Sequence, residues 1–400
     1  MVSTRHISPI KALAPANVSL VDPSVHTIRQ TDLIFNPPID NAIHLPGLLD
    51  ESKLREAVSL STKVWPTVAG RWGRRSKPGG GHDSVIRLTK SDIPFETQVL
   101  ATSQPFADIR VIQDFKQTHL YIPQFANPGF LVPDGSFSLI MFRLTTLESS
   151  QTSVIGISWH HILGDAQVCS RYLKQLSAIY DALVRAIEPH DFFEYPDYNS
   201  AVGVDHMSDE TVQDTMKMLD TSAMDKSLPR QSTLDSRQHQ MDVNWDLVTI
   251  SFAARELEDM KQLAVEASKG DLHWSTRGDV IVAWWLSTAL GFGWPVFRVD
   301  FLMMFRGLWR DHPAFPDTLP LSVGNKSIIA HTDIPHGSHL PDIAKALRHV
   351  IEATKLDSAG SLAEINNIAS IFPASERSGI VRQPVGNWDD GVVFLNSIAM

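Results

Sequence analysis

Residues 137–184 constrain the fold of this chain more than any other stretch. Two apolar, β-branched runs, FSLIMFRLTTL and TSVIGISW, are separated by the polar residues ESSQ, which is typical of paired strands buried in a sheet. The segment AQVCSRYLKQLSAIYDALV follows them and predicts an amphipathic helix, because apolar residues recur along it at steps of four and three. The residues of this predicted inner face are Cys169, Leu173, Leu176, Tyr180 and Leu183. The sequence therefore predicts two paired strands, a tight turn and a helix in succession.

The turn between the second strand and the helix carries the residues HHILGDA. Neighbouring side chains of a strand point to opposite faces, so we expect His160 and His161 to diverge, which argues against both binding one metal ion. Gly164 permits a tight turn, and Asp165 stands where a carboxylate can cap the free N–H groups of the helix. A histidine at such a strand end is well suited to accept a proton near neutral pH.

The spacing of His161 and Asp165 is not specific by itself, because a chain with 16 His and 32 Asp is expected to contain about one His-x-x-x-Asp by chance. A buried, hydrogen-bonded histidine followed by a helix-capping aspartate would give the same pattern without catalysis. The sequence contains no nucleophile elbow, Walker loop, dinucleotide glycine fingerprint or zinc-spaced Cys/His set that would compete for a catalytic role. From these residues alone, a catalytic and a purely structural interpretation both stay open.

The chain divides around a polar stretch at 199–244, which is rich in Asp, Ser, Met, Thr and Gln and predicts a crossover linker. Helical patterns occur on both sides of it, at 50–64 with Asp50 as the cap, and at 253–268, 278–290 and 341–355; a strand pattern occurs at 391–400. We predict a mixed α/β fold with an N-terminal domain at 1–198 and a C-terminal domain at 245–400.

Composition narrows the class of protein. The chain of 400 residues is 43% hydrophobic and 20% charged, which is ordinary for a globular protein, and its net charge of −10 argues against nucleic acid as a partner. Cys169 is the one cysteine, so no intramolecular disulfide can form, which fits a reducing compartment. No apolar run has the length of a membrane span, and the first residues lack the apolar core of a signal peptide. We expect a cytoplasmic protein that does not insert into membranes.

The segment HHILGDA resembles the H-x-x-x-D-G motif of the BAHD acyltransferases, the acyl-CoA-dependent enzymes of plant and fungal secondary metabolism. Further blocks resemble this family in the same order along nearly the whole chain: WPTVAGRW upstream, the strand pair before the motif, STRGDVIVAWWLSTAL, and the stretch from VDFLMMFRGLWRDHP to SVGN. The chain is therefore identified as similar to a BAHD acyltransferase of the fungal type.

The resemblance implies two chloramphenicol-acetyltransferase-like domains, mixed sheets flanked by helices, with a channel between them. It implies acyl-CoA as co-substrate, with acetyl the expected acyl group, a small secondary metabolite as acceptor through a hydroxyl or an amine, no permanently bound cofactor or metal, and a monomer. His161 would be the general base, without an acyl-enzyme. Asp165 would hold the loop by pairing with Arg306, with Arg310 as the alternative partner, and Asn325 of the Gly-Asn pair would be structural.

The chain departs from the family pattern in two places. Ala166 replaces the final glycine of the motif, and the Asp-Phe-Gly-Trp-Gly motif of the family's C-terminal part does not follow FLNSIAM. The resemblance therefore suggests that the C-terminal domain lacks its last strands. Asn396 and Ser397 occupy the polar positions of this final strand pattern, and Ser397 is a candidate donor to an oxyanion.

Two other functions compete with the acyl-CoA acyltransferase. Condensation domains of peptide synthetases carry a similar H-H-x-x-x-D-G motif, so a stand-alone enzyme using carrier-protein thioesters is one alternative. A truncated, non-catalytic binding paralogue is the other, because the C-terminal motif is missing.

Overall fold

The structure of the protein is a computed structural model that describes residues 2–8, 24–33, 38–76, 82–89, 91–101, 118–123, 137–198, 250–268, 275–306, 308–309, 322–366, 369 and 392–395. The chain forms two compact units. The first contains residues 1–201 and 318–325, and the second contains residues 202–317 and 326–400. The sequence interpretation assigned 318–325 to the C-terminal domain, so the return of this short segment to the first unit is a difference.

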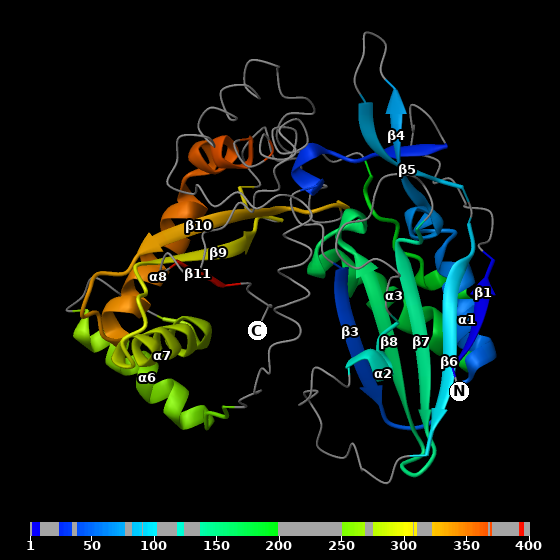
Figure 1. Ribbon diagram of the computed structural model, residues 1–400, viewed down its shortest axis with the longest axis horizontal. Coiled ribbons are helices and arrows are strands. Elements are labelled where there is room, and N and C mark those ends of the chain that lie inside the picture. Colours follow the sequence, from blue (N-terminus) through cyan, green and yellow to red (C-terminus); the bar gives the residue numbers. More distant parts are fainter. Residues whose placement is uncertain are drawn as a thin grey trace. The chain divides into compact units, whose positions relative to one another are not determined.

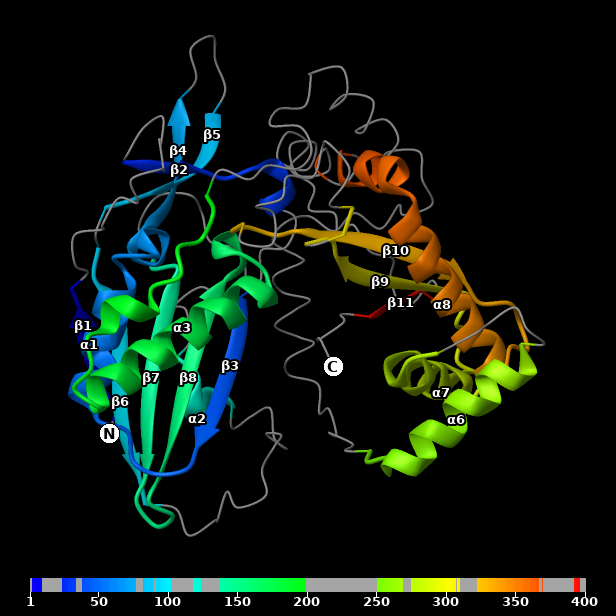
Figure 2. The ribbon, with the colours of Figure 1, turned by 180° about the vertical axis from the view of Figure 1, so that it is seen from behind.

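The first unit is built on a five-stranded mixed sheet with the order β1-β6-β7-β8-β3. The β6–β7 pair is parallel and the other neighbours are antiparallel. Helices α1 and α3 cover one face of this sheet, and the short α2 lies on the other face (Figures 1 and 2). The elements are β1 (Ser3–Ile7), β3 (Pro38–Leu45), α1 (Glu51–Ser61), β6 (Ile93–Leu100), α2 (Thr118–Tyr121), β7 (Ile140–Leu147), β8 (Thr152–His160) and α3 (Ala166–Val184).

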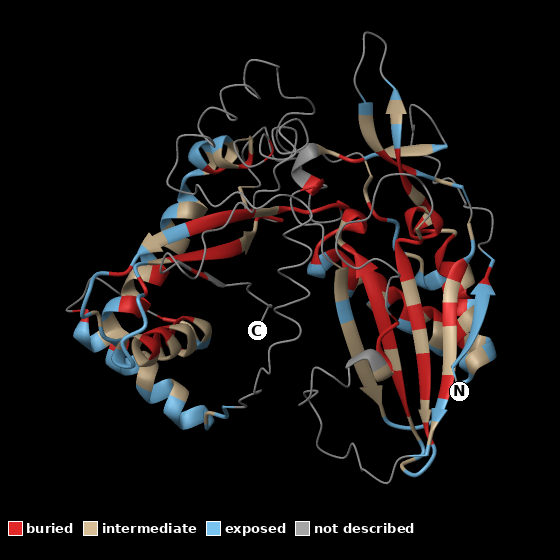
Figure 3. Cartoon of the chain, in the orientation of Figure 1, coloured by how far each residue is buried: buried red, intermediate tan, exposed pale blue. Residues whose placement is uncertain are grey.

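The predicted strand pair and helix are confirmed. Antiparallel pairing of β7 with β8 runs from Ile140 opposite Trp159 to Leu147 opposite Thr152. Figure 3 shows that these central strands are largely buried, as their apolar sequences require. Helix α1 begins where predicted, because the Asp50 side chain accepts the N–H of Lys53 at 3.0 Å.

The predicted inner face of α3 is partly wrong. Tyr172 rather than Leu173 turns inward, with its ring 5.4 Å from that of Trp159 and 5.8 Å from that of Trp65. The polar Gln175 is also buried, because its side chain accepts the indole N–H of Trp65. An apolar periodicity cannot show either contact. The buried residues of α3 are Val168, Cys169, Tyr172, Gln175, Leu176, Ile179 and Ala182.

A smaller antiparallel sheet with the order β2-β5-β4 and several 3₁₀ turns complete the part of the first unit that the structure describes. These elements are β2 (Val25–Thr27), η1 (Gln30–Leu33), η2 (Pro66–Ala69), β4 (Arg71–Ser76), β5 (His82–Arg87), η5 (His161–Leu163) and η6 (Pro189–Phe192).

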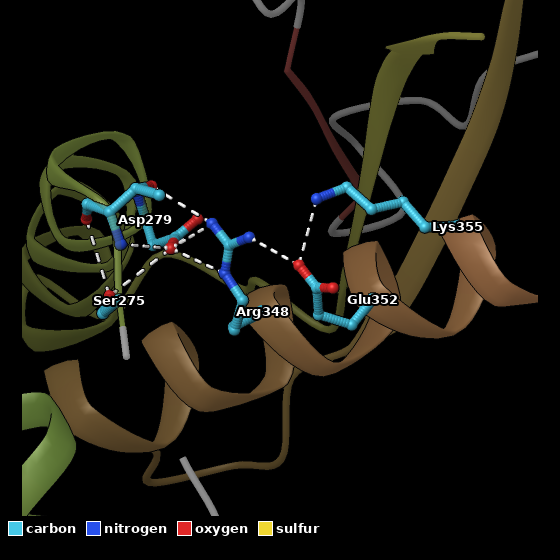
Figure 4. A network of polar contacts seen from close by, with 6 residues as sticks. Ser275, Asp279, Arg348, Glu352 and Lys355 are labelled. Carbon is cyan, nitrogen blue, oxygen red and sulfur yellow. Dashed lines mark hydrogen bonds and ion pairs between the residues drawn. The ribbon is translucent and has the colours of Figure 1, made fainter. Parts of the chain in front are cut away.

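The second unit contains a three-stranded sheet with the order β10-β9-β11, in which β9 is antiparallel to β10 and parallel to β11. Helix α8 packs on α7, α6 and β10 around an apolar core. A buried polar network also joins α8 to α7 (Figure 4). The elements are α6 (Ala254–Ala267), α7 (Arg277–Gly291), β9 (Arg298–Met304), β10 (Ser327–Asp333), α8 (Leu340–Leu356) and β11 (Val392–Leu395). Among the described helices, none combines the length and apolar character of a membrane span.

The chain segment before β10 makes two isolated parallel bridges, one to the turn after β8 and one to the residues after η6. Gly164 pairs with Gly324, and Asp197 pairs with Ser322. The N–H of Val323 donates to the carbonyl of Asp197 at 3.0 Å. These bonds bring Asn325, which belongs to the first unit, beside the HHILGDA turn.

Candidate active site

The turn after β8 is held in one conformation by its own backbone and by its glycine. His160 is the last residue of β8, and His161 begins the 3₁₀ turn η5. Gly164 has φ of 140°, and a Cβ built there would lie 2.6 Å from the Cβ of Val168. A side chain at this position is therefore both strained and sterically excluded. The indole N–H of Trp159 donates to the carbonyl of Gly164 at 2.8 Å and fixes the turn against the sheet.

The first of the two histidines is a structural residue. His160 is 1% exposed, and its Nδ1 accepts the backbone N–H of Ile162 at 3.2 Å. Burial, and secondarily the neighbouring His161, lowers the pKa of His160 to about 3. The ring is therefore neutral at physiological pH and caps the turn as an acceptor.

The second histidine has a different partner. His161 is partly exposed, and its Nδ1 lies 3.1 Å from Oδ1 of Asn325. The amide group of Asn325 is oriented by its Nδ2, which donates to the main-chain carbonyl of Asp32 at 2.6 Å. Because Oδ1 can only accept, Nδ1 of His161 carries the proton, and Nε2 keeps the lone pair of the neutral ring. This arrangement leaves Nε2 as a base.

Electrostatics favour the neutral form of this base. Burial lowers the pKa of His161 below its ordinary value of 6.5, and the hydrogen bond to Asn325 and the charge of Asp165 oppose that decrease. A histidine with these influences is deprotonated at neutral pH, as general-base chemistry requires.

Asp165 caps helix α3. Its Oδ1 accepts the backbone N–H groups of Gln167 at 3.1 Å and Val168 at 3.2 Å, and the residue is 1% exposed. The predicted partner Arg306 is a buried residue just after β9 in the second unit, and its pairing with Asp165 stays a prediction. The alternative partner Arg310 and the candidate site residues Asn396 and Ser397 lie outside the described residues.

Sequence reasoning missed the role of Asn325. It was expected to be structural, and its Oδ1 is the atom that lies 3.1 Å from Nδ1 of His161. The two residues are 164 positions apart, so only the family-like Gly-Asn pair marked Asn325 in the sequence. Across the described ranges, no group of three or more His, Cys, Asp or Glu side chains could hold a metal ion.

The sequence matches no protein-family model and no curated protein. Solved structures are similar in fold. Vinorine synthase has a TM-score of 0.57 at 14% identity, over 99% of this chain and 83% of that one. TRI101 of F. sporotrichioides, complexed with coenzyme A and T-2, has a TM-score of 0.56 at 12% identity, over 93% and 83%. The first condensation domain of the calcium-dependent antibiotic synthetase has a TM-score of 0.50 at 12% identity, over 94% and 80%.

Because the identities are low, these likenesses bear on the fold alone. They agree with the mixed sheets and the flanking helices of the described residues. The predicted fold class is confirmed: this chain has the mixed α/β fold of BAHD-type, chloramphenicol-acetyltransferase-like acyltransferase structures.

Proposed function

We propose that this protein is an acyltransferase that moves an acyl group from acyl-CoA to a hydroxyl or an amine of a small molecule. The observation that carries the proposal is the contact of His161 Nδ1 with Oδ1 of Asn325, whose Nδ2 is bound to the main-chain carbonyl of Asp32; from it we infer the tautomer with a basic Nε2. The TRI101 structure, which shares the fold, holds coenzyme A together with the small molecule T-2. That pair of ligands supports acyl-CoA as donor and a small molecule as acceptor, by analogy of fold.

In the proposed reaction, Nε2 of His161 removes the proton from the acceptor O–H or N–H as the acceptor attacks the thioester carbonyl. The tetrahedral intermediate collapses, the carbon–sulfur bond breaks, and the imidazolium returns its proton to the leaving thiolate of CoA. Oδ1 of Asn325 accepts the Nδ1–H throughout and stabilises the positive charge while it exists. No acyl-enzyme forms. Ser397 and Asn396 are the proposed site-lining residues, with Ser397 the first candidate for an oxyanion donor.

The remaining roles belong to the same proposal. Asp165, with Arg306 as its partner, would keep the turn in place and would not exchange protons with substrate. We further propose acetyl-CoA as the donor, a hydroxyl of a fungal-type secondary metabolite as the acceptor, and a cytoplasmic monomer. No cofactor besides the co-substrate is needed for this chemistry.

A second candidate uses the same base with another donor. The similarity in fold to a condensation domain favours an enzyme that takes its acyl group from a carrier-protein thioester. The two candidates differ in what carries the thioester and not in what His161 does. A non-catalytic binding protein is the third outcome.

The experiment that tests the proposal is release of free thiol from acetyl-CoA in the presence of a panel of hydroxyl and amine acceptors, with mass spectrometry of the products. We expect thiol release that depends on His161 and an unchanged mass of the intact protein, since no acyl-enzyme forms. Turnover with an acyl carrier protein and none with any acyl-CoA would favour the condensation-type enzyme. Binding of CoA without turnover from either donor would favour the non-catalytic protein.

A further inference from the structure

Asp32 holds Asn325 at two points. It lies in the 3₁₀ turn η1, 293 positions before Asn325, and is 4% exposed. Its Oδ1 accepts the backbone N–H of Asn325 at 2.7 Å, and its own main-chain carbonyl accepts Nδ2–H at 2.6 Å. The carboxylate therefore fixes the backbone of Asn325, and the carbonyl fixes the amide of its side chain.

The neighbouring glycine makes this approach possible. Gly324 has φ of 81°, and a Cβ there would lie 2.5 Å from the Asp32 carboxylate. The carboxylate thus packs directly on the backbone of Gly324, which also forms the bridge to Gly164 in the histidine turn. Three segments far apart in sequence meet at this point: η1, residues 322–325 and the turn after β8.

The amide of an asparagine can present either of its ends, and the two ends have opposite effects on a histidine. If the Asn325 amide turned over, Nδ2 would face His161 and donate to its Nδ1. The histidine would then carry its proton on Nε2, and Nε2 could not accept another. That orientation would also bring Oδ1 against the main-chain carbonyl of Asp32, where two acceptors repel. The main-chain carbonyl of Asp32 thus favours the amide orientation in which Oδ1 faces His161.

We propose that Asp32 is a positioning residue for the acyl transfer. Its carboxylate holds the backbone of Asn325 where the main-chain carbonyl of Asp32 can orient the amide, and this keeps the proton of His161 on Nδ1 and the lone pair on Nε2. The catalytic part of this inference rests on the proposed function. The tautomer is a property of the free protein and can be measured without substrate. Arg29 is a charged side chain that acts on Asp32: burial lowers the pKa of Arg29, and the Asp32 carboxylate opposes that decrease.

The first test is the tautomer of His161, read from long-range proton–nitrogen NMR correlations of protein labelled in its 16 histidines, at mildly alkaline pH. The His161 signals are assigned with His161→Gln. We expect Nδ1–H in the native protein. We expect a mixture of tautomers in Asp32→Ala, which keeps its main-chain carbonyl but loses the carboxylate that holds the backbone of Asn325 in reach of it. Asp32→Asn should show Nδ1–H again, since its side-chain carbonyl still accepts the N–H of Asn325. Asp50→Ala is the matched control, because it removes a carboxylate-to-backbone bond of the same kind at the exposed start of α1.

The second test is kinetic. Asp32→Ala should lower kcat by ~10–100-fold, which is the size expected when one buried hydrogen bond that orients the base is lost. The KM for acetyl-CoA should stay the same, since Asp32 is argued to act only through Asn325. Asp32→Asn should recover most of kcat, and Asp50→Ala should leave both constants unchanged.

Several outcomes would overturn the inference. A native protein with the proton of His161 on Nε2 refutes it directly, even if Asp32→Ala does not fold. So does a folded Asp32→Ala protein, or the nearly isosteric Asp32→Leu, that keeps the Nδ1–H tautomer. If the native protein shows the expected tautomer but transfers no acyl group from any donor, the proposed function fails while the role of Asp32 in holding Asn325 stands.

Discussion

Replacing Arg348 with methionine should destabilise the second unit more than any exposed charge in it could. The guanidinium lies between α8 and α7, 6% exposed, and both Nε, at 3.0 Å, and Nη2, at 2.5 Å, contact Oδ2 of Asp279, which is 5% exposed (Figure 4). The Nη2 also donates to Oγ1 of Thr276 at 3.2 Å. Arg348→Met keeps most of the apolar stem and removes the charge, so it leaves a buried carboxylate without its cation.

The magnitude follows from burial. Breaking a buried ion pair by removing one partner costs about 3–5 kcal/mol, whereas an exposed pair is worth about 0–1 kcal/mol. Lys355→Ala is the matched control, because Lys355 contacts Glu352 at the open end of the same network, where the side chains are 36% and 39% exposed. Removing both buried charges, in Asp279→Leu with Arg348→Met, should cost less than the single change. The remaining cost is that of the helix cap, about 1 kcal/mol, since Asp279 also accepts the N–H of Thr276.

Hydrogen exchange in increasing urea, followed by mass spectrometry, measures this for the second unit alone. Peptides from α7 and α8 report the free energy of unfolding there, which avoids treating a chain of two units as a single two-state system. Arg348→Met should lower that free energy by about 3–5 kcal/mol and Lys355→Ala by less than about 1 kcal/mol. Equal losses in the two variants, or a double variant less stable than Arg348→Met, would refute the argument from burial.

Four further predictions concern the histidine turn. His161→Ala should lower the rate of acyl transfer by ~10²–10⁴, and His160→Ala should lower it less while reducing stability. Steady-state kinetics measure the rates and melting curves measure the stability. A larger kinetic loss in His160→Ala than in His161→Ala would reverse the assignment. Because burial lowers the pKa of His161 and only the neutral ring is a base, kcat/KM should rise with pH through a pKa below 6.5 and then level off. Asp165→Asn should move that limb to lower pH, since the carboxylate raises this pKa; a shift to higher pH would contradict the cause given. The pKa of the buried His160 is about 3, against about 6.5 in the unfolded chain, so only the unfolded state takes up a proton between these values. The free energy of unfolding should therefore fall by about 1.4 kcal/mol per pH unit as pH falls from 6.5 toward 3. Urea titrations of His160→Gln should lack this pH dependence.

The parts of the fold that sequence predicted well are those fixed by neighbours along the chain. The strand pair β7–β8 and helix α3 follow from short-range periodicity, and the caps at Asp50 and Asp165 follow from the free N–H groups of the next turn. The prediction of the inner face of α3 was wrong where the polar side chain of Gln175 is buried and accepts the indole N–H of Trp65. The hydrophobic pattern of the helix cannot predict this bond, because the partner, Trp65, is 110 positions away.

The candidate site shows the same difference between contacts of neighbouring residues and contacts of residues far apart in the sequence. The histidine turn was visible as a motif, but the residues that give it its chemistry come from elsewhere in the chain. Asn325 reaches His161 because residues 322–325 return to the first unit, and Asp32 reaches Asn325 from a short 3₁₀ turn. No composition, period or spacing marks either contact. The crossover linker at 199–244 and the final residues Asn396 and Ser397 stay predictions, since they lie outside the described residues.

The sequence left a catalytic and a structural interpretation of the histidine motif open, and under the proposed function the two adjacent rings fit one each. His160 is buried, accepts a backbone N–H and is held neutral by burial, which is the structural case. His161 is partly exposed and donates Nδ1–H to an amide whose orientation is fixed from outside the turn. The aspartate does not discriminate between them, because Asp165 caps α3 whatever the histidine does. Under the proposed function, the acceptor on Nδ1 of His161 is therefore what leaves Nε2 as the base.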